Sequence, residues 1–133
     1  MTTDLTDEAF ARAFERGEVT PAEFDHRAHV RVAWVYLREA GDIEAATDRM
    51  REAIRRFAAA ANASTKYHET ITVLWMRLLD DARARVPVAS ELVELFRHCP
   101  ELADKDLPLK YYSRERLFSD EARAGWIPPE TAP

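Results

Sequence analysis

The scarcity of glycine is the feature that most constrains the fold of this chain. The 133-residue sequence contains three glycines, whereas alanine, leucine, glutamate and arginine are abundant. Sheets and their tight turns use glycine and β-branched residues, and the residues abundant here are good helix formers. The sequence therefore predicts an all-α protein.

The length and the balance of residue types predict one domain. A chain of 133 residues suffices for one hydrophobic core and is short for two. Apolar residues make up 47% and charged residues 32%, which is typical of chains that fold on their own. We expect a single domain over residues 1–133, with a compact bundle of about five helices in 1–100 and an extended C-terminal tail, 101–133, packed on it.

Charge and cysteine content restrict the partners and the compartment. The net charge of −5 gives no attraction for a phosphate backbone, so no nucleic-acid partner is expected. A single cysteine, Cys99, and the absence of a basic and then apolar leader fit a reducing cytoplasm. Apolar runs such as 32–37 are far shorter than the roughly 20 residues that span a bilayer, so no membrane partner is expected. A helical chain of this size is compatible with a homodimer.

Capping residues and apolar residues spaced three and four apart predict five helices. The expected N-terminal caps are Thr6, Thr20 (in the capping box Thr20-Pro21-Ala22-Glu23), Asp42, Ser64 or Thr65, and Ser90. The expected ends are Gly17, Gly41, Asn62, Pro87 and Pro100. In the tail, Ser113 and Ser119 resemble caps and predict brief helical turns. The apolar residues expected to dock the tail are Leu107, Leu109, Tyr111, Leu117, Phe118 and Trp126.

Three histidines are predicted to face the interior. At 100° per residue, His26 and His29 share the apolar stripe of the second predicted helix. His68 lies in line with Ile71 and Trp75 on the fourth. We therefore expect the three imidazoles to converge on one partly enclosed pocket.

These histidines support two interpretations. Three neutral imidazoles could hold a divalent transition metal (Zn, Fe, Cu, Ni or Mn) and leave an open coordination position, with Glu69 as a fourth ligand, a general base or an orienting group. Tyr67 would then be a donor at the pocket mouth. Alternatively, each imidazole hydrogen-bonds a carbonyl, a hydroxyl or a neighbour as a structural core residue, and Tyr67 is a packing residue.

A second cluster lies in the tail and combines basic side chains with hydroxyl groups. Lys110, Tyr112 and Arg114 could bind an anionic group of a substrate. The alternative is a solvated charged face, because lysine and arginine are mostly surface residues.

Several segments resemble a family of small, functionally uncharacterised bacterial proteins. The segments are Phe24-Asp25-His26-Arg27-Ala28-His29-Val30, Tyr67-His68-Glu69-Thr70-Ile71-Thr72 and, in the tail, Asp104-Lys105-Asp106-Leu107, Tyr112-Ser113, Leu117-Phe118-Ser119 and Ala122-Arg123. Their most specific patterns are F-x-H-x-x-H and Y-H-E-T-I-T. The resemblance implies one shared fold and one shared site, and it implies no particular reaction.

Two classes of function follow. The first is a small metal-dependent enzyme, in which the histidine site polarises a small molecule or activates water or dioxygen while Glu69 moves a proton. The alternative is a non-catalytic helical module that binds a small ligand or another protein, with structural histidines and the tail as a contact surface. The chain has no G-x-S-x-G, P-loop, dinucleotide or H-E-x-x-H motif, so functions that depend on those motifs have no support.

Overall fold

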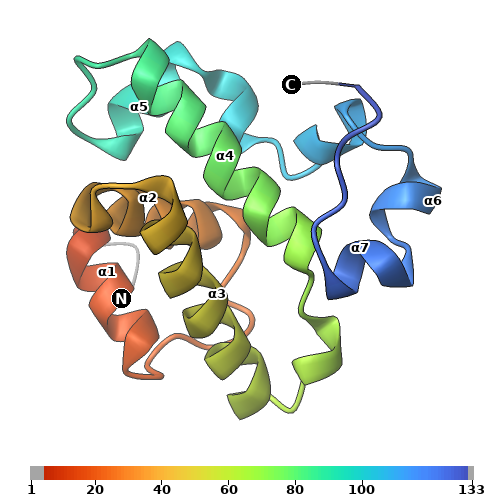
Figure 1. Cartoon of the computed structure of the whole chain (residues 1–133). Coiled ribbons are helices and arrows are strands. Elements are labelled where there is room, and N and C mark those ends of the chain that lie inside the picture. The colour runs from red at the N-terminus through yellow and green to blue at the C-terminus, as the bar shows by residue number, and fades with distance from the viewer. Residues whose placement is uncertain (1–4, 132–133) are drawn as a thin grey trace. The chain divides into compact units, whose positions relative to one another are not determined.

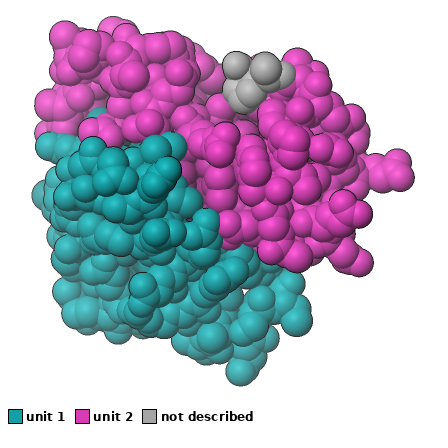
Figure 2. Space-filling view, in the orientation of Figure 1, with its two compact units in different colours: residues 1–67 teal, residues 68–133 magenta. Residues whose placement is uncertain are grey.

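The described part of the chain is helical throughout. A computed structural model describes residues 5–131, and in that range every regular element is an α-helix or a 3₁₀ turn. The predicted all-α class is therefore confirmed. The chain divides into two compact units, residues 1–67 and 68–133 (Figures 1 and 2). In this division the tail, residues 101–133, belongs to the same unit as the helix that begins at Glu69. The single-domain description stays a prediction.

The first unit is a set of three helices that contact one another. They are α1 (Asp7–Glu15), α2 (His26–Ala40) and α3 (Ile43–Ala60). Helix α2 packs against both α1 and α3, and α1 also contacts α3. The largest fully buried side chains of this unit are Phe10, Trp34, Tyr36, Leu37 and Met50.

Local sequence explains where these helices begin and end. The side chains of Thr6 and Asp42 accept hydrogen bonds from the backbone N–H groups of Ala9 and Ala45, which confirms both predicted caps. Gly17 and Gly41 follow α1 and α2 with φ of 75° and 83°, a left-handed conformation that favours glycine.

The predicted start of α2 at Thr20 is wrong. Thr20 and Glu23 do form the reciprocal capping box, with Thr20 N–H to Glu23 Oε1 at 2.9 Å and Glu23 N–H to Thr20 Oγ1 at 3.2 Å. This box closes only one turn. Asp25 then adopts an extended conformation and accepts from the N–H of Ala28, so the helix begins at His26.

The second unit contains two longer helices followed by short turns. Its α-helices are α4 (Glu69–Arg85), α5 (Leu92–His98), α6 (Arg114–Leu117) and α7 (Asp120–Ala124). Two 3₁₀ turns, Pro100–Ala103 and Leu107–Lys110, join α5 to α6. Helix α4 packs against α7, and α6 contacts both α7 and the Leu107–Lys110 turn.

The helical turns of the tail are confirmed, and most of its apolar residues are covered. Ser113 and Ser119 accept hydrogen bonds from the N–H groups of Arg116 and Ala122 and cap α6 and α7. Leu107 and Leu117 are each 2% exposed. Phe118 is an exception, because it is 46% exposed although docking was expected.

The predicted start of the fourth helix at Ser64 or Thr65 is also wrong. Residues Ser64–Lys66 form an isolated 3₁₀ turn without a side-chain cap. The N-terminal cap of α4 is His68. Within residues 5–131, no helix is both long enough and apolar enough to cross a membrane.

Candidate functional site

His26 and His29 lie in the first turn of α2. Both side chains are half-buried, and Asp25 precedes them as the cap. The imidazole ring of His29 lies 5.9 Å from the ring of Phe24 in a tilted arrangement. His29 therefore borders the aromatic residues of the first unit.

The environment of His29 keeps its imidazole neutral. Burial lowers the pKa of His29 to about 4, and a positive charge on the neighbouring His26 lowers this pKa further. At neutral pH, His29 therefore has one ring nitrogen with a free lone pair. This state suits hydrogen-bond acceptance and also metal ligation.

His68 uses both of its ring nitrogens in hydrogen bonds. Its Nδ1 accepts from the backbone N–H of Ile71 at 3.1 Å, and its Nε2 lies 2.6 Å from the carbonyl oxygen of Leu117. A carbonyl can only accept, so the proton is on Nε2 and the lone pair is on Nδ1. Burial lowers the pKa of His68, which favours this neutral tautomer, whereas the bond to Leu117 acts in the opposite direction.

The threonines of the Y-H-E-T-I-T segment are buried and also hydrogen-bonded. Thr70 Oγ1 donates to the carbonyl of Gly125 at 2.8 Å and accepts from the N–H of Ile127 at 3.2 Å. Thr72 Oγ1 donates to the carbonyl of His68 at 2.8 Å. The first turn of α4 thus binds the backbone of the tail at Leu117, Gly125 and Ile127.

The two residues that flank His68 occupy different environments. Tyr67 is half-buried in the first unit, and the guanidinium carbon of Arg55 lies 4.7 Å from the centre of its ring. Glu69 is the first residue of α4 and is 9% exposed. A carboxylate at this position is favoured by the helix dipole.

The three predicted metal ligands belong to different units. His26 and His29 are in the first unit, and His68 opens the second. Their convergence on one pocket stays a prediction. Among residues 5–131, no group of three or more His, Cys, Asp or Glu side chains is arranged to hold a metal ion.

The residues of the predicted anion site differ in exposure. Lys110 and Arg114 are exposed, but Tyr112 is 2% exposed and donates to the carbonyl of Ile127 at 2.6 Å. The nearby Arg116 donates to the carbonyl of Pro128 at 2.9 and 3.2 Å. Tyr112 and Arg116 therefore hold the end of the tail.

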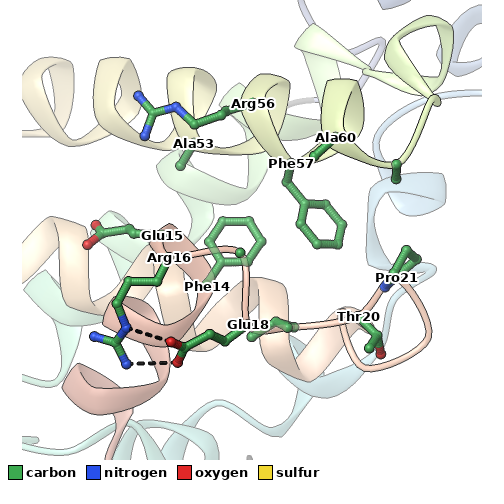
Figure 3. A pocket seen from close by; sticks show the side chains of 13 residues that line it. Phe14, Glu15, Arg16, Glu18, Thr20, Pro21, Ala53, Arg56, Phe57 and Ala60 are labelled. Carbon is green, nitrogen blue, oxygen red and sulfur yellow. Dashed lines mark hydrogen bonds and ion pairs between the residues drawn. The ribbon is translucent and has the colours of Figure 1, made fainter.

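A cavity in the first unit was not predicted from the sequence. It has a volume of about 500 Å³ and lies between the end of α1, the segment 16–21 and the last turns of α3 (Figure 3). In Figure 3, the rings of Phe14 and Phe57 face this space, and Ala53 and Ala60 line it from α3. The volume is in the range of small-molecule sites, which are concave and mostly apolar.

Two phenyl rings, Phe14 and Phe57, line the cavity, and a third ring, Phe24, packs against both of them. Phe14 and Phe57 lie 5.0 Å apart between ring centres. Phe24 stacks on Phe14 at 4.5 Å with an interplanar angle of 15°, and it lies 5.0 Å from Phe57. Each ring therefore touches the other two, which restricts the orientation of the wall.

The loop that lines one side of the cavity, residues 16–21, is fixed by the C-terminal cap of α1. Gly17 N–H donates to the carbonyl of Phe14 at 3.1 Å, and Glu18 N–H donates to the carbonyl of Ala13 at 2.9 Å. This pair of bonds is the Schellman arrangement, in which a left-handed glycine reverses the chain. The side chain of Val19 is then buried.

A network of charged residues holds the carboxylate of Glu15 at the cavity edge. The hydroxyl of Tyr36 donates to Glu15 Oε2 at 2.6 Å, and Arg12 Nε lies 3.2 Å from Glu15 Oε1. Arg49 lies 3.7 Å from Glu15 and 3.1 Å from Glu39, which also pairs with Arg12 at 2.9 Å. Burial raises the pKa of the Tyr36 hydroxyl most, and the hydrogen bond to Glu15 raises this pKa further. The hydroxyl therefore keeps its proton and remains a donor.

One sequence signal pointed toward the cavity. Phe10 and Phe14 are four residues apart, on one face of the first helix, and the spacing of the apolar residues puts Phe57 on the apolar stripe of the third. Periodicity does not show whether such rings fill a core completely or leave space between them. The cavity can therefore be recognised only from the way α1 packs against α3 in the structure.

Comparison of the chain with protein-family models, curated proteins and solved structures finds no match. The family resemblance of the histidine segments accordingly stays an expectation from sequence.

Proposed function

We propose that this chain is a non-catalytic helical module that binds a small molecule in the cavity of its first unit. The observation that carries the proposal is a cavity of about 500 Å³ with a wall of phenyl rings and alanines. Sites of this size and lining bind ligands by burying apolar surface.

The hydrogen bonds of His68 support a structural role for this histidine. Its two ring nitrogens already cap α4 and bind Leu117, so metal ligation through either nitrogen would require the loss of one bond. A buried donor or acceptor left without a partner costs about 1–3 kcal/mol. This cost favours the structural interpretation over the metal site.

Titration of the protein with a fluorescent dye tests the proposal. N-phenylnaphthylamine, an uncharged dye whose emission rises in apolar surroundings, should bind the full-length protein with one site per chain. Ala53→Phe places a phenyl ring in the cavity and should weaken binding by about tenfold, a loss of about 1.4 kcal/mol.

Ala59→Phe is the matched control. Ala59 is exposed on the same helix and does not line the cavity, so this variant should bind the dye like the wild type. Circular dichroism and thermal unfolding establish that both variants are folded. Equal dye binding by all three proteins, or no binding by the wild type, would contradict the proposal.

A metal-dependent enzyme is the second candidate function. What favours it is the position of His26 and His29 three residues apart in the first turn of α2, where burial lowers the pKa of His29 to about 4. His26, His29 and His68 would hold a divalent transition metal, which would supply Lewis-acid chemistry, and Glu69 would carry a proton. Elemental analysis of the purified protein after reconstitution distinguishes this candidate from the first.

The proposal also includes a cytoplasmic location and a small-molecule partner. A cytoplasmic location agrees with one cysteine, Cys99, whose side chain is buried. A small molecule is the proposed partner, and a homodimer is compatible with it. Nucleic acid is not proposed, because the net charge is −5.

A further inference from the structure

We infer that the cavity of the first unit selects an uncharged, flat and largely apolar molecule, such as a fused-ring aromatic compound. This inference rests on the proposed ligand-binding function and names the chemistry of the ligand. It is carried by two features of the lining: charged residues that already have partners of opposite charge, and a wall of mutually packed aromatic rings.

Both arginines of the cavity lining, Arg16 and Arg56, pair with a carboxylate. Arg16 binds Glu18 through two hydrogen bonds, Nη2 to Oε1 at 2.9 Å and Nε to Oε2 at 3.1 Å (Figure 3). This pairing raises the pKa of Arg16 and lowers the pKa of Glu18. Arg56, the other cationic residue of the lining, pairs with Glu52 at 2.7 Å.

The remaining charged residue of the lining, Glu15, also has partners of opposite charge. Glu15 pairs with Arg12 and Arg49 and accepts from the Tyr36 hydroxyl. A charged ligand would lose hydration on entering the cavity and would have to compete with these partners, which is unfavourable. An uncharged ligand loses little hydration and leaves the ion pairs intact.

The aromatic wall favours a flat ligand. Because Phe24 stacks on Phe14 and also touches Phe57, the two rings of the lining are fixed before a ligand binds. Apart from Phe57 and Arg56, α3 and its C-terminal cap line the cavity with small side chains, Ala53, Ala60 and Ala61. Aromatic molecules gain offset-stacked or edge-to-face contacts with phenyl rings beyond the gain from buried area.

Two dyes with one skeleton test the charge preference. N-phenylnaphthylamine is neutral, and anilinonaphthalene sulfonate adds one negative charge to the same rings. The neutral dye should bind the wild type about tenfold more tightly, and this difference should persist across salt concentrations. Equal or tighter binding of the sulfonate would overturn the inference, while dye binding in the cavity would still support the proposed function.

The Glu18→Gln variant tests whether the ion pair is the cause. It removes the negative charge that pairs with Arg16, so affinity for the sulfonate should rise about two- to fivefold, the scale of an exposed ion pair, while affinity for the neutral dye stays unchanged. Asp81→Asn is the matched control, because it removes the partner of Arg85, which does not line the cavity. An equal gain in both variants would assign the effect to net charge and overturn the role of Arg16 and Glu18.

A competition experiment tests the preference for a flat molecule. Naphthol and decahydronaphthol have the same carbon skeleton, but only naphthol is flat. Naphthol should displace N-phenylnaphthylamine at a several-fold lower concentration. Equal displacement would overturn the shape preference while the proposed function stands, whereas failure of the neutral dye to bind would overturn both.

Discussion

Nε2 of His68 lies 2.6 Å from the carbonyl oxygen of Leu117, a residue 49 positions further along the chain. The other nitrogen of the same ring caps α4 through the N–H of Ile71. One side chain therefore both starts a helix and holds the tail. This double use gives the Y-H-E-T-I-T segment a structural explanation that requires no ligand.

Replacement of His68 should separate its two roles. His68→Ala should lower the free energy of unfolding by about 1–3 kcal/mol, because it removes a cap and leaves the Leu117 carbonyl without this partner. His68→Asn can still cap α4 but is too short to replace the Nε2 bond, so it should recover part of the loss. Urea unfolding measures both effects. His98→Ala, at an exposed position, is the control, and an equal loss there would contradict the assignment.

Two threonines of the same turn provide an isosteric comparison. Thr70→Val removes bonds to Gly125 and Ile127 and should cost about 1–3 kcal/mol, with faster amide exchange at Ile127. Thr72→Val removes only a bond to the carbonyl of His68, which also accepts the N–H of Thr72, and should cost less. Equal exchange at Ile127 in both variants would contradict a specific attachment of the tail by Thr70.

The parts of the fold that local sequence determines could be predicted. Ser113 and Ser119 cap their turns because a serine hydroxyl reaches an N–H three residues ahead regardless of distant contacts. The start of α4 could not be predicted in this way. His68 is not among the favoured caps, and its ring is held in place by the Leu117 carbonyl, a contact between residues distant in sequence.

The candidate sites show the same limit. Helical periodicity predicts that His26 and His29 lie on one side of α2, and both side chains are half-buried in the first turn of this helix. The cavity depends on Phe14 and Phe57 from two helices and on the loop after Gly17. A pattern within one helix carries no information about space left between helices.

Metal content decides between structural and ligating histidines. If the second candidate function holds, the wild type should retain about one equivalent of a divalent transition metal after reconstitution and dialysis. His26→Ala and His68→Ala should abolish retention in a folded protein, whereas Glu69→Gln should retain the metal and reduce any activity. A wild type that takes up no metal but is destabilised by His68→Ala would exclude this candidate and leave the structural role.

Acid should destabilise the protein through His29 and His68. Burial lowers the pKa of His29 to about 4 and also lowers the pKa of His68, whereas an unfolded histidine has a pKa of about 6.5. Below pH 6.5 the unfolded chain therefore binds protons that the folded chain does not. The free energy of unfolding should be constant above about pH 7.5 and should fall toward pH 5, by up to about 1.4 kcal/mol per pH unit for each such histidine.

Urea unfolding at pH 8, 7, 6 and 5 measures this dependence in a range where most carboxylates remain ionised. His29→Gln should reduce the slope below pH 6.5, because the variant lacks the group that unfolding allows to protonate. His98→Gln, at the exposed end of α5, should keep the slope of the wild type. A wild type with the same stability at pH 8 and pH 5 would show that these imidazoles are not held neutral by the fold. A slope that persists in both His29→Gln and His68→Asn would assign the acid sensitivity to other groups.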